Sequence, residues 1–136
     1  MELRLYLDST VEPFAKISFN KRKVFLLLEK LKEHGINVSI IDTAGWNKEM
    51  IYEVYLNAAR VAIFRGYKAY RIRKIFGSAR DSGKYFGREV PALLVYDKGE
   101  VIDVYPHEEK GKLITIEEFL EEKLRELERK EGGEHG

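Results

Sequence analysis

The sequence predicts an α/β domain whose elements follow the order strand, helix, strand, helix, strand, strand, helix. Apolar residues alternate with polar ones near the N-terminus, which is typical of a strand with one buried face. Three longer segments carry apolar residues at three- and four-residue spacing, which predicts helices. A proline-headed apolar run is followed by a glycine-containing turn, which predicts a hairpin. The length of 136 residues suits one such domain.

The first part of the chain predicts a strand, a helix and a second strand. Leu3, Leu5 and Leu7 alternate with other residues and form the first strand. After a proline-containing loop, Asn20 caps a helix that stops at Gly35. The inward positions of this helix are Val24, Leu27, Leu28 and Leu31. A β-branched run after Gly35 forms the second strand, and this crossover implies that the two strands are parallel.

A second helix is expected to begin after Asn47 and to break at Gly66. Its apolar face consists of Ile51, Val54, Tyr55, Ala58 and Ala62. A continuous helix from Asn47 to Phe76 would be about 43 Å long, too long for this domain. Residues 77–87 contain three glycines and predict a loop. The segment of about 64–84 is therefore an insert, helical or irregular, before the third strand.

Pro91 is expected at the start of the third strand. A proline cannot donate a hydrogen bond inside a strand ladder, so the first position of a strand is one of the few places where it is tolerated. The apolar residues at 93–96 fill this strand. Gly99 can take the positive φ angle that the following turn requires, so residues 101–105 return as an antiparallel fourth strand.

The last helix is marked by a capping box formed by Thr115 and Glu118. Its inward positions are Ile116, Phe119, Leu120, Leu124 and Leu127. Beyond Arg129 the chain is polar and glycine-rich. We therefore expect one domain at 1–129 and a flexible tail at 130–136.

Composition excludes several kinds of function. The chain has no cysteine, so disulfides, thiolate metal ligands and thiol catalysis are excluded. Its three histidines are scattered, which predicts no metal site, and no motif indicates a cofactor. Charged residues make up 35% of the chain, 24 Lys and Arg against 23 Asp and Glu, a density typical of thermophile surfaces. There is no apolar run of about 18 residues, which predicts a soluble, cytoplasmic protein without a membrane partner.

The order of the elements, with a proline at the head of the third strand, resembles the thioredoxin fold over most of the chain. Thioredoxins carry a tyrosine-glycine pair, a basic residue, an aliphatic residue and a cis-proline before this strand. Here Phe86-Gly87-Arg88 and Val90-Pro91 match that pattern, and Lys98-Gly99 matches the turn that follows. The resemblance implies a three-layer α/β/α sandwich with a mixed four-stranded sheet, and an extra insert before the cis-proline strand.

The active-site motif of the resembled family is changed here. The Cys-Gly-Pro-Cys motif falls on Val11-Glu12-Pro13-Phe14, which keeps the proline and lacks both cysteines. Disulfide exchange needs a thiolate, so the resemblance implies a domain without redox chemistry. Asp42 stands at the end of the second strand, where that family often has an aspartate.

A domain of this kind is expected to bind a protein or peptide. In the resembled family the residue before the cis-proline pairs with an extended peptide, a form of strand addition. The candidate peptide-binding residues are Val11, Pro13, Phe14, Trp46, Glu89, Val90 and Pro91. The competing interpretation is that Pro91 only shapes the start of the strand, and the sequence leaves its isomer open.

A basic, aromatic segment provides the alternative function of a nucleic-acid-binding adaptor. Nine Lys and Arg residues but one Asp lie in the range 60–88. Such a mixture can attract phosphates and stack on bases. The candidate residues are Arg60, Arg65, Lys68, Tyr70, Arg71, Arg73, Lys74, Arg80, Lys84 and Arg88. Alternatively, these charges pair with the acidic last helix.

An enzyme is the third interpretation, and the weakest. Asp8 and Asp42 end neighbouring strands at the usual ligand edge of an α/β sheet, beside Ser9 and Thr10. Either these aspartates form an active site, or they cap turns. A serine or threonine nucleophile needs an adjacent base, and no histidine is near in the sequence. Nothing in the sequence indicates an oligomeric state.

Overall fold

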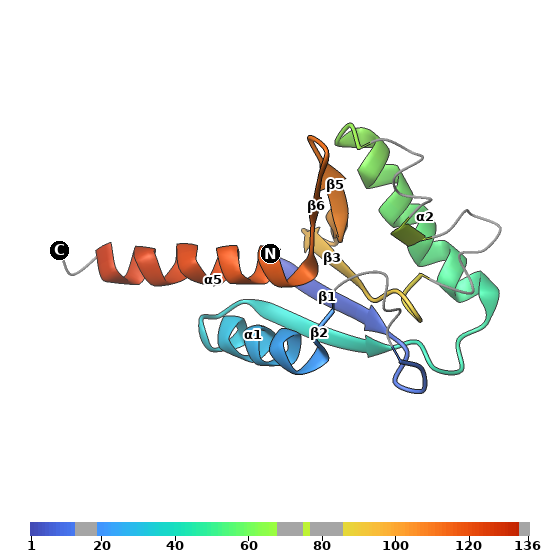
Figure 1. Ribbon diagram of the computed structural model, residues 1–136, viewed down its shortest axis with the longest axis horizontal. Coiled ribbons are helices and arrows are strands. Elements are labelled where there is room, and N and C mark those ends of the chain that lie inside the picture. Colours follow the sequence, from blue (N-terminus) through green and yellow to red (C-terminus); the bar gives the residue numbers. More distant parts are fainter. Residues whose placement is uncertain (13–18, 68–74, 77–85, 134–136) are drawn as a thin grey trace.

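The computed structural model describes residues 1–12, 19–67, 75–76 and 86–133 (Figure 1). The strands within them are β1 (Glu2–Leu7), β2 (Asn37–Asp42), β3 (Ala92–Asp97), β4 (Glu100–Tyr105), β5 (His107–Glu109) and β6 (Lys112–Ile114). The helices are α1 (Lys21–Glu33), α2 (Lys48–Phe64) and α5 (Ile116–Gly133). The α/β class that the sequence predicts is confirmed.

The main sheet has the strand order β2-β1-β3-β4. β1 lies inside the sheet, where Leu5 is opposite Ile40 of the parallel strand β2 and opposite Leu93 of the antiparallel strand β3. β4 pairs antiparallel with β3. The mixed four-stranded sheet is therefore confirmed, and it places the carboxyl ends of β1 and β2 at one edge.

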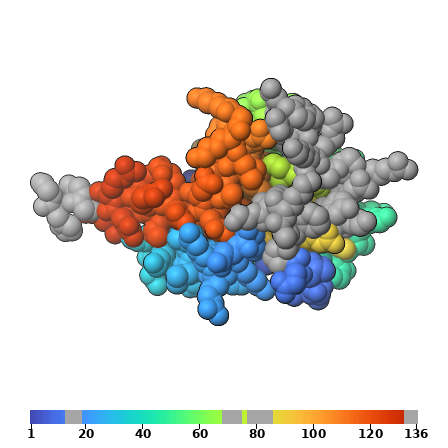
Figure 2. Space-filling view, viewed as in Figure 1, coloured from blue at the N-terminus to red at the C-terminus, as the bar shows by residue number. Residues whose placement is uncertain are grey.

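Helices cover both faces of the sheet, because successive strand residues point to opposite sides. On one face, α1 and α5 pack over Leu3, Leu5, Leu7, Leu93 and Val95. On the other face, α2 packs over Tyr6, Ala92, Leu94, Tyr96 and Val104. Figure 1 shows α1 and α5 side by side and α2 apart from them. Figure 2 shows α5 projecting at one end of the molecule, beside α1.

The predicted helix starts are confirmed by hydrogen bonds. The side chain of Asn20 accepts a hydrogen bond from the Lys23 amide at 3.1 Å, and Asn47 accepts one from the Met50 amide at 2.9 Å. These side chains satisfy amides that have no partner inside the helix. The Thr115 hydroxyl likewise accepts a hydrogen bond from the Glu118 amide at 3.1 Å.

Two tight hairpin turns are both formed by a Lys-Gly pair with positive φ angles. Lys98 and Gly99 have φ angles of 51° and 81°, as a two-residue hairpin turn requires. Lys110 and Gly111 have φ angles of 52° and 79°, and they join β5 to β6 in a second hairpin that we did not predict. A second Lys-Gly pair was the available signal, but β5 and β6 are three residues long and largely polar.

The ends of the predicted insert and tail are partly described. α2 ends at Phe64, and Gly66 has a φ of 82°, at the expected break. Residues 68–74 and 77–84 of the insert, and Tyr85 after it, lie outside the described part, but Phe76 is 1% exposed and belongs to the core beside α2. α5 continues to Gly133, four residues beyond the predicted end at Arg129, and 134–136 lie outside the described residues.

A substitution at Gly87 would test how tightly the loop before β3 packs against β1. Its φ is +67°, and an added Cβ would lie 3.3 Å from the Cβ of Tyr6. Gly45 also has a positive φ, +81°, but nothing lies within 4 Å of an added Cβ. We expect Gly45→Ala to lower the free energy of unfolding by about 1 kcal/mol, from backbone strain alone. Gly87→Ala should cost about 1 kcal/mol more, from crowding.

Urea denaturation of both variants measures this difference. Equal losses in the two variants would show that the contact between Gly87 and Tyr6 is not tight.

Candidate functional site

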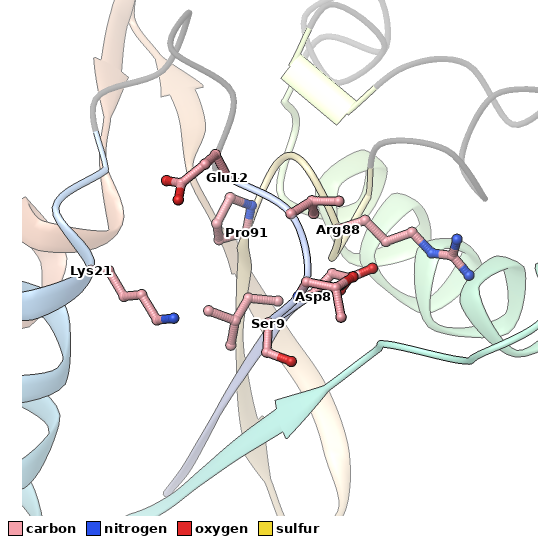
Figure 3. Close-up of a pocket in the computed structure, with 9 residues that line it drawn as sticks. Asp8, Ser9, Glu12, Lys21, Arg88 and Pro91 are labelled. Carbon is pink, nitrogen blue, oxygen red and sulfur yellow. Dashed lines mark hydrogen bonds between the residues drawn. The ribbon is translucent and has the colours of Figure 1, made fainter.

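A pocket of about 130 Å³ lies at the edge of the sheet where β1 ends. Its walls come from the loop after β1, from the first residue of α1 and from the residues before β3. The lining residues are Leu7, Asp8, Ser9, Thr10, Val11, Glu12, Lys21, Arg88 and Pro91 (Figure 3). The structure thus brings residues 7–12 and Pro91 to one site, which we call the Pro91 pocket.

Two aspartates hold the loop after β1. Asp8 Oδ1 accepts hydrogen bonds from the Thr10 amide at 2.8 Å and from the Thr10 hydroxyl at 2.5 Å. Asp42 Oδ1 accepts from the amides of Ser9 at 3.1 Å and Ala44 at 3.0 Å, and Asp42 Oδ2 accepts from the Ser9 hydroxyl at 2.5 Å. Both aspartates therefore act in turns, which agrees with the capping interpretation.

These hydrogen bonds lower the pKa of Asp42. The Ser9 hydroxyl is the largest cause, followed by the amides of Ala44 and Ser9, and the charge of Lys21 adds to them. A carboxylate with a lowered pKa is a weaker base. The Ser9 hydroxyl therefore donates to a group that is poorly suited to remove its proton, and a nucleophilic role for Ser9 is not favoured.

The two basic side chains of the pocket, Lys21 and Arg88, point in different directions. In Figure 3 the ammonium of Lys21 points into the gap between α1 and Ser9, whereas the guanidinium of Arg88 points away. Arg88 donates a hydrogen bond to the backbone carbonyl of Trp46. Lys21 and Glu12 are both exposed, so they are the charged side chains that a ligand in the pocket could meet.

Two of the predicted peptide-binding residues, Val11 and Pro91, line the pocket. Val11 is 38% exposed, whereas Pro91 is buried. Trp46 packs edge-on against Tyr6, with ring centroids 6.1 Å apart, and neither Trp46 nor Glu89 lines the pocket. The remaining residues, Pro13 and Phe14, lie outside the described residues.

Val90 is less available to a peptide than the resemblance implies. It is 4% exposed, and its carbonyl accepts a hydrogen bond from the Gly87 amide at 2.9 Å. Among the described residues the cis peptide bond is Tyr105–Pro106, and the bond between Val90 and Pro91 is trans. The cis-proline that the resemblance implies at the head of the third strand is therefore wrong for Pro91. A ligand at this site would therefore meet side chains rather than the Val90 carbonyl.

The predicted nucleic-acid-binding segment is only partly described. Lys68, Tyr70, Arg71, Arg73, Lys74, Arg80 and Lys84 lie outside the described residues, and Arg60, Arg65 and Arg88 lie within them. Arg65 Nε donates to the Tyr67 hydroxyl at 2.9 Å. On α5, Glu121 pairs with Lys23 of α1 at 2.6 Å. The alternative pairing of the basic segment with α5 is thus not made by Arg65 or Arg88.

A buried polar cluster was missed by the sequence analysis. Asp103 of β4 is 7% exposed and accepts hydrogen bonds from the hydroxyls of Tyr67 at 2.8 Å and Tyr105 at 3.0 Å, and from the Val104 amide at 2.9 Å. Arg65 Nε lies 3.6 Å from Asp103 Oδ1. These donors and this cation compensate a carboxylate that would be costly to bury alone.

His107 completes this cluster, which we call the Asp103 cluster. It is 2% exposed, its ring stacks on that of Tyr67 at 4.1 Å, and its Nδ1 donates to the Val104 carbonyl at 2.7 Å. The available signal was the two-residue spacing of Asp103, Tyr105 and His107, which is the period of a strand face. Tyr67 comes from a distant segment, and no local pattern predicts it.

The Ser9 hydroxyl is expected to control the titration of Asp42. Since its hydrogen bond is the largest cause of the lowered pKa, Ser9→Ala should raise the pKa of Asp42 toward the ordinary value of about 4. A group with a lowered folded pKa stabilises the fold above its unfolded pKa, and this contribution disappears as the pH falls through the folded value. The variant should therefore be less stable than the wild type near neutral pH, and this difference should shrink as the pH falls through the folded pKa of Asp42.

Carboxyl-carbon NMR titration measures the pKa of Asp42 directly. Thr10→Val is the matched control, because Thr10 bonds to Asp8 and should leave Asp42 unchanged. An unshifted Asp42 pKa in Ser9→Ala would refute the assignment.

The Asp103 cluster gives a prediction at high pH. Burial raises the pKa of Tyr67 and of Tyr105, and the Asp103 carboxylate raises both further. Because the folded values exceed the unfolded value of about 10, the stabilisation is complete below that pH and is lost as the pH rises. Asp103→Ala should lower both pKa values. Tyr96, whose pKa is raised by burial and by Tyr6, should not respond.

Ring-carbon NMR titration of the tyrosines checks this result, and an unchanged Tyr96 shows that the variant is folded. Unchanged pKa values of Tyr67 and Tyr105 would contradict the described contacts with Asp103.

In the described part of the chain, no helix is long and apolar enough to cross a membrane. The same residues contain no group of three or more metal-binding side chains. Neither the family models nor the curated proteins nor the solved structures that were compared with this chain contain a match.

Proposed function

We propose that this protein is a non-redox, thioredoxin-like domain that binds a protein or peptide segment at the Pro91 pocket. The observation that carries the proposal is the position of this pocket: residues 7–12 and Pro91 line one concave site. The mixed four-stranded sheet, with α1 and α5 on one face and α2 on the other, supports the thioredoxin-like assignment. That fold resemblance is an analogy, and the function rests on the site.

The chemistry of the pocket favours binding over catalysis. The chain has no cysteine, so the site has no sulfur nucleophile. Its hydroxyls, on Ser9 and Thr10, both donate to aspartates that hold the loop. The lowered pKa of Asp42 makes it a weak base. A loop held by these hydrogen bonds, with charged groups at its surface, is suited to binding a ligand.

The size and charge of the pocket restrict the ligand. A space of about 130 Å³ accommodates one side chain of a peptide rather than a cofactor. Lys21 and Glu12 stand at its walls with opposite charges, and the exposed part of Val11 adds an apolar contact. We therefore expect a segment that inserts one polar or charged side chain and lays its apolar neighbours across Val11.

The test is an NMR titration with hexapeptides that differ at one central residue: Glu, Lys, Ser or Leu. We expect the amide signals of Ser9, Thr10, Val11 and Lys21 to shift most. Lys21→Gln should weaken binding of the Glu peptide, and Glu12→Gln should weaken binding of the Lys peptide, because each removes the opposite charge.

Lys30→Gln is the matched control, since Lys30 is exposed on α1 in its last turn, away from the pocket. If none of the four peptides shifts these amides, or if all shifts lie elsewhere, the pocket is not a peptide site.

A further inference from the structure

The strand β2 forms one edge of the main sheet (Figure 1). Just after this strand, the Thr43 amide donates a hydrogen bond to the Leu7 carbonyl of β1 at 2.8 Å. Along a strand, the backbone groups of successive residues point alternately to its two sides. The amide and carbonyl groups of Val38 and Ile40 therefore point away from β1. Within the described residues these groups have no hydrogen-bond partner.

The β2 edge lacks the features that normally keep the edge of a sheet from pairing with another chain. Such features are a lysine, a proline or a bulge in the edge strand. The sequence of β2, from Asn37 to Asp42, contains no lysine, arginine or proline, and its pairing with β1 is continuous over all 6 residues. A row of free donors and acceptors is therefore presented by an unbroken strand whose one charged residue, Asp42, stands at its end.

The opposite edge of the sheet, β4, is protected by such a feature. Its pairing with β3 shifts between Val95 and Tyr96, and Ile102 has no partner in β3. A bulge of this kind interrupts regular pairing and increases the local twist. β4 also carries two acidic residues, Glu100 and Asp103. Of these two edges, β2 is therefore the better suited to pair with another strand.

The sequence of β2 is complementary to itself. When two copies of β2 pair antiparallel about a two-fold axis at Ser39, Val38 of each copy lies opposite Ile40 of the other. The backbone groups of these residues point outward, so each such pair can exchange two hydrogen bonds. The pairing also brings aliphatic side chains together and covers Ile40, which is 45% exposed in the single chain. Asp42 of one copy lies opposite Ile36 of the other, so like charges do not meet, whereas an axis at Ile40 would place Val38 opposite Asp42.

We propose that this protein forms a two-fold symmetric dimer in which the β2 strands of two copies pair antiparallel and join their sheets into one. A two-fold contact uses the same surface twice, so this surface must be complementary to itself, a condition that β2 meets. Selection of a foreign strand relies on charged groups or pockets beside the edge, and β2 offers one charged residue at its end. No residue of β2 lines the Pro91 pocket, so the dimer can be tested separately from ligand binding there.

A cysteine introduced at Ser39 tests the proposed register, because the chain has no cysteine of its own. The two Ser39 residues face each other at the axis as a non-hydrogen-bonded pair, in which the Cα atoms are about 4.5 Å apart. This separation permits a disulfide. Ser39→Cys should therefore form a covalent dimer under mild oxidation, measured on a non-reducing gel.

Asn37→Cys is the matched control, because Asn37 lies in the same strand and on the same face of the sheet as Ser39. In the proposed register the two copies of residue 37 are displaced by four residues along the paired strands, which is about 14 Å. No disulfide can span this distance, so Asn37→Cys should remain monomeric on the same gel.

Sedimentation velocity over a range of protein concentrations measures the dimer without a crosslink. We expect the wild type to change from monomer to dimer as the concentration rises. Ile40→Lys should weaken the dimer roughly ten-fold or more, because it replaces an apolar contact by a charge near the axis. Ile102→Lys alters an isoleucine that is 40% exposed on the opposite edge and should leave the dimer intact. Circular dichroism checks that both variants are folded.

Hydrogen exchange of the wild-type protein needs no substitution. The amides of Val38 and Ile40 should exchange quickly in dilute protein and more slowly in concentrated protein, because the second copy supplies their acceptors. The Thr43 amide, which is bonded to Leu7 within one chain, should keep the same protection at both concentrations.

Several outcomes would overturn the proposal. The wild type stays monomeric at every concentration, or Ser39→Cys crosslinks no faster than Asn37→Cys. Ile40→Lys dimerises as tightly as the wild type, or Ile102→Lys dissociates the dimer, which would place the interface on β4. The amides of Val38 and Ile40 are protected in the monomer, which would assign the β2 edge to another segment of the same chain.

Discussion

The fold depends on the position of β1 inside the sheet. Its backbone pairs with β2 on one side and β3 on the other, while Leu5 and Tyr6 point to the two opposite cores. A strand buried on both faces needs helices on both sides, and α1, α5 and α2 supply them. The same placement sets the site, because β1 and β2 are parallel and their carboxyl ends bring Asp8 and Asp42 to one edge.

Much of this arrangement could be predicted from local patterns. The capping residues Asn20, Asn47 and Thr115 mark helix starts because their side chains bond to nearby amides. The Lys98-Gly99 turn was predictable from the need for positive φ. The second hairpin was missed, since its three-residue strands show no hydrophobic alternation. The end of α5 was placed four residues early, because glycine and polar residues disfavour a helix without excluding one.

The candidate site was predictable only in part. Parallel strand ends meet, so Asp8, Ser9 and Asp42 could be grouped from topology alone. The inward-facing Val90 could not be foreseen, since its carbonyl is taken by Gly87, a contact that the loop geometry creates. The Asp103 cluster was predictable only in its local part, the two-residue spacing of Asp103, Tyr105 and His107. In the sequence Asp103 resembles any polar strand residue. Its burial depends on the hydroxyl of Tyr67, 36 positions away, which donates a hydrogen bond to it.

The Asp103 cluster joins α2 to β4 through Arg65. Its Nε donates to Tyr67, its Nη1 donates to the Ile102 carbonyl, and Tyr67 in turn donates to Asp103. A long cationic side chain loses conformational freedom when it is held in one geometry. Here that loss is offset by two hydrogen bonds and by the charge of Asp103, 3.6 Å from Arg65 Nε. Arg65 therefore fixes the C-terminal end of α2 against β4, and the buried carboxylate of Asp103 is compensated by a cation that the helix supplies.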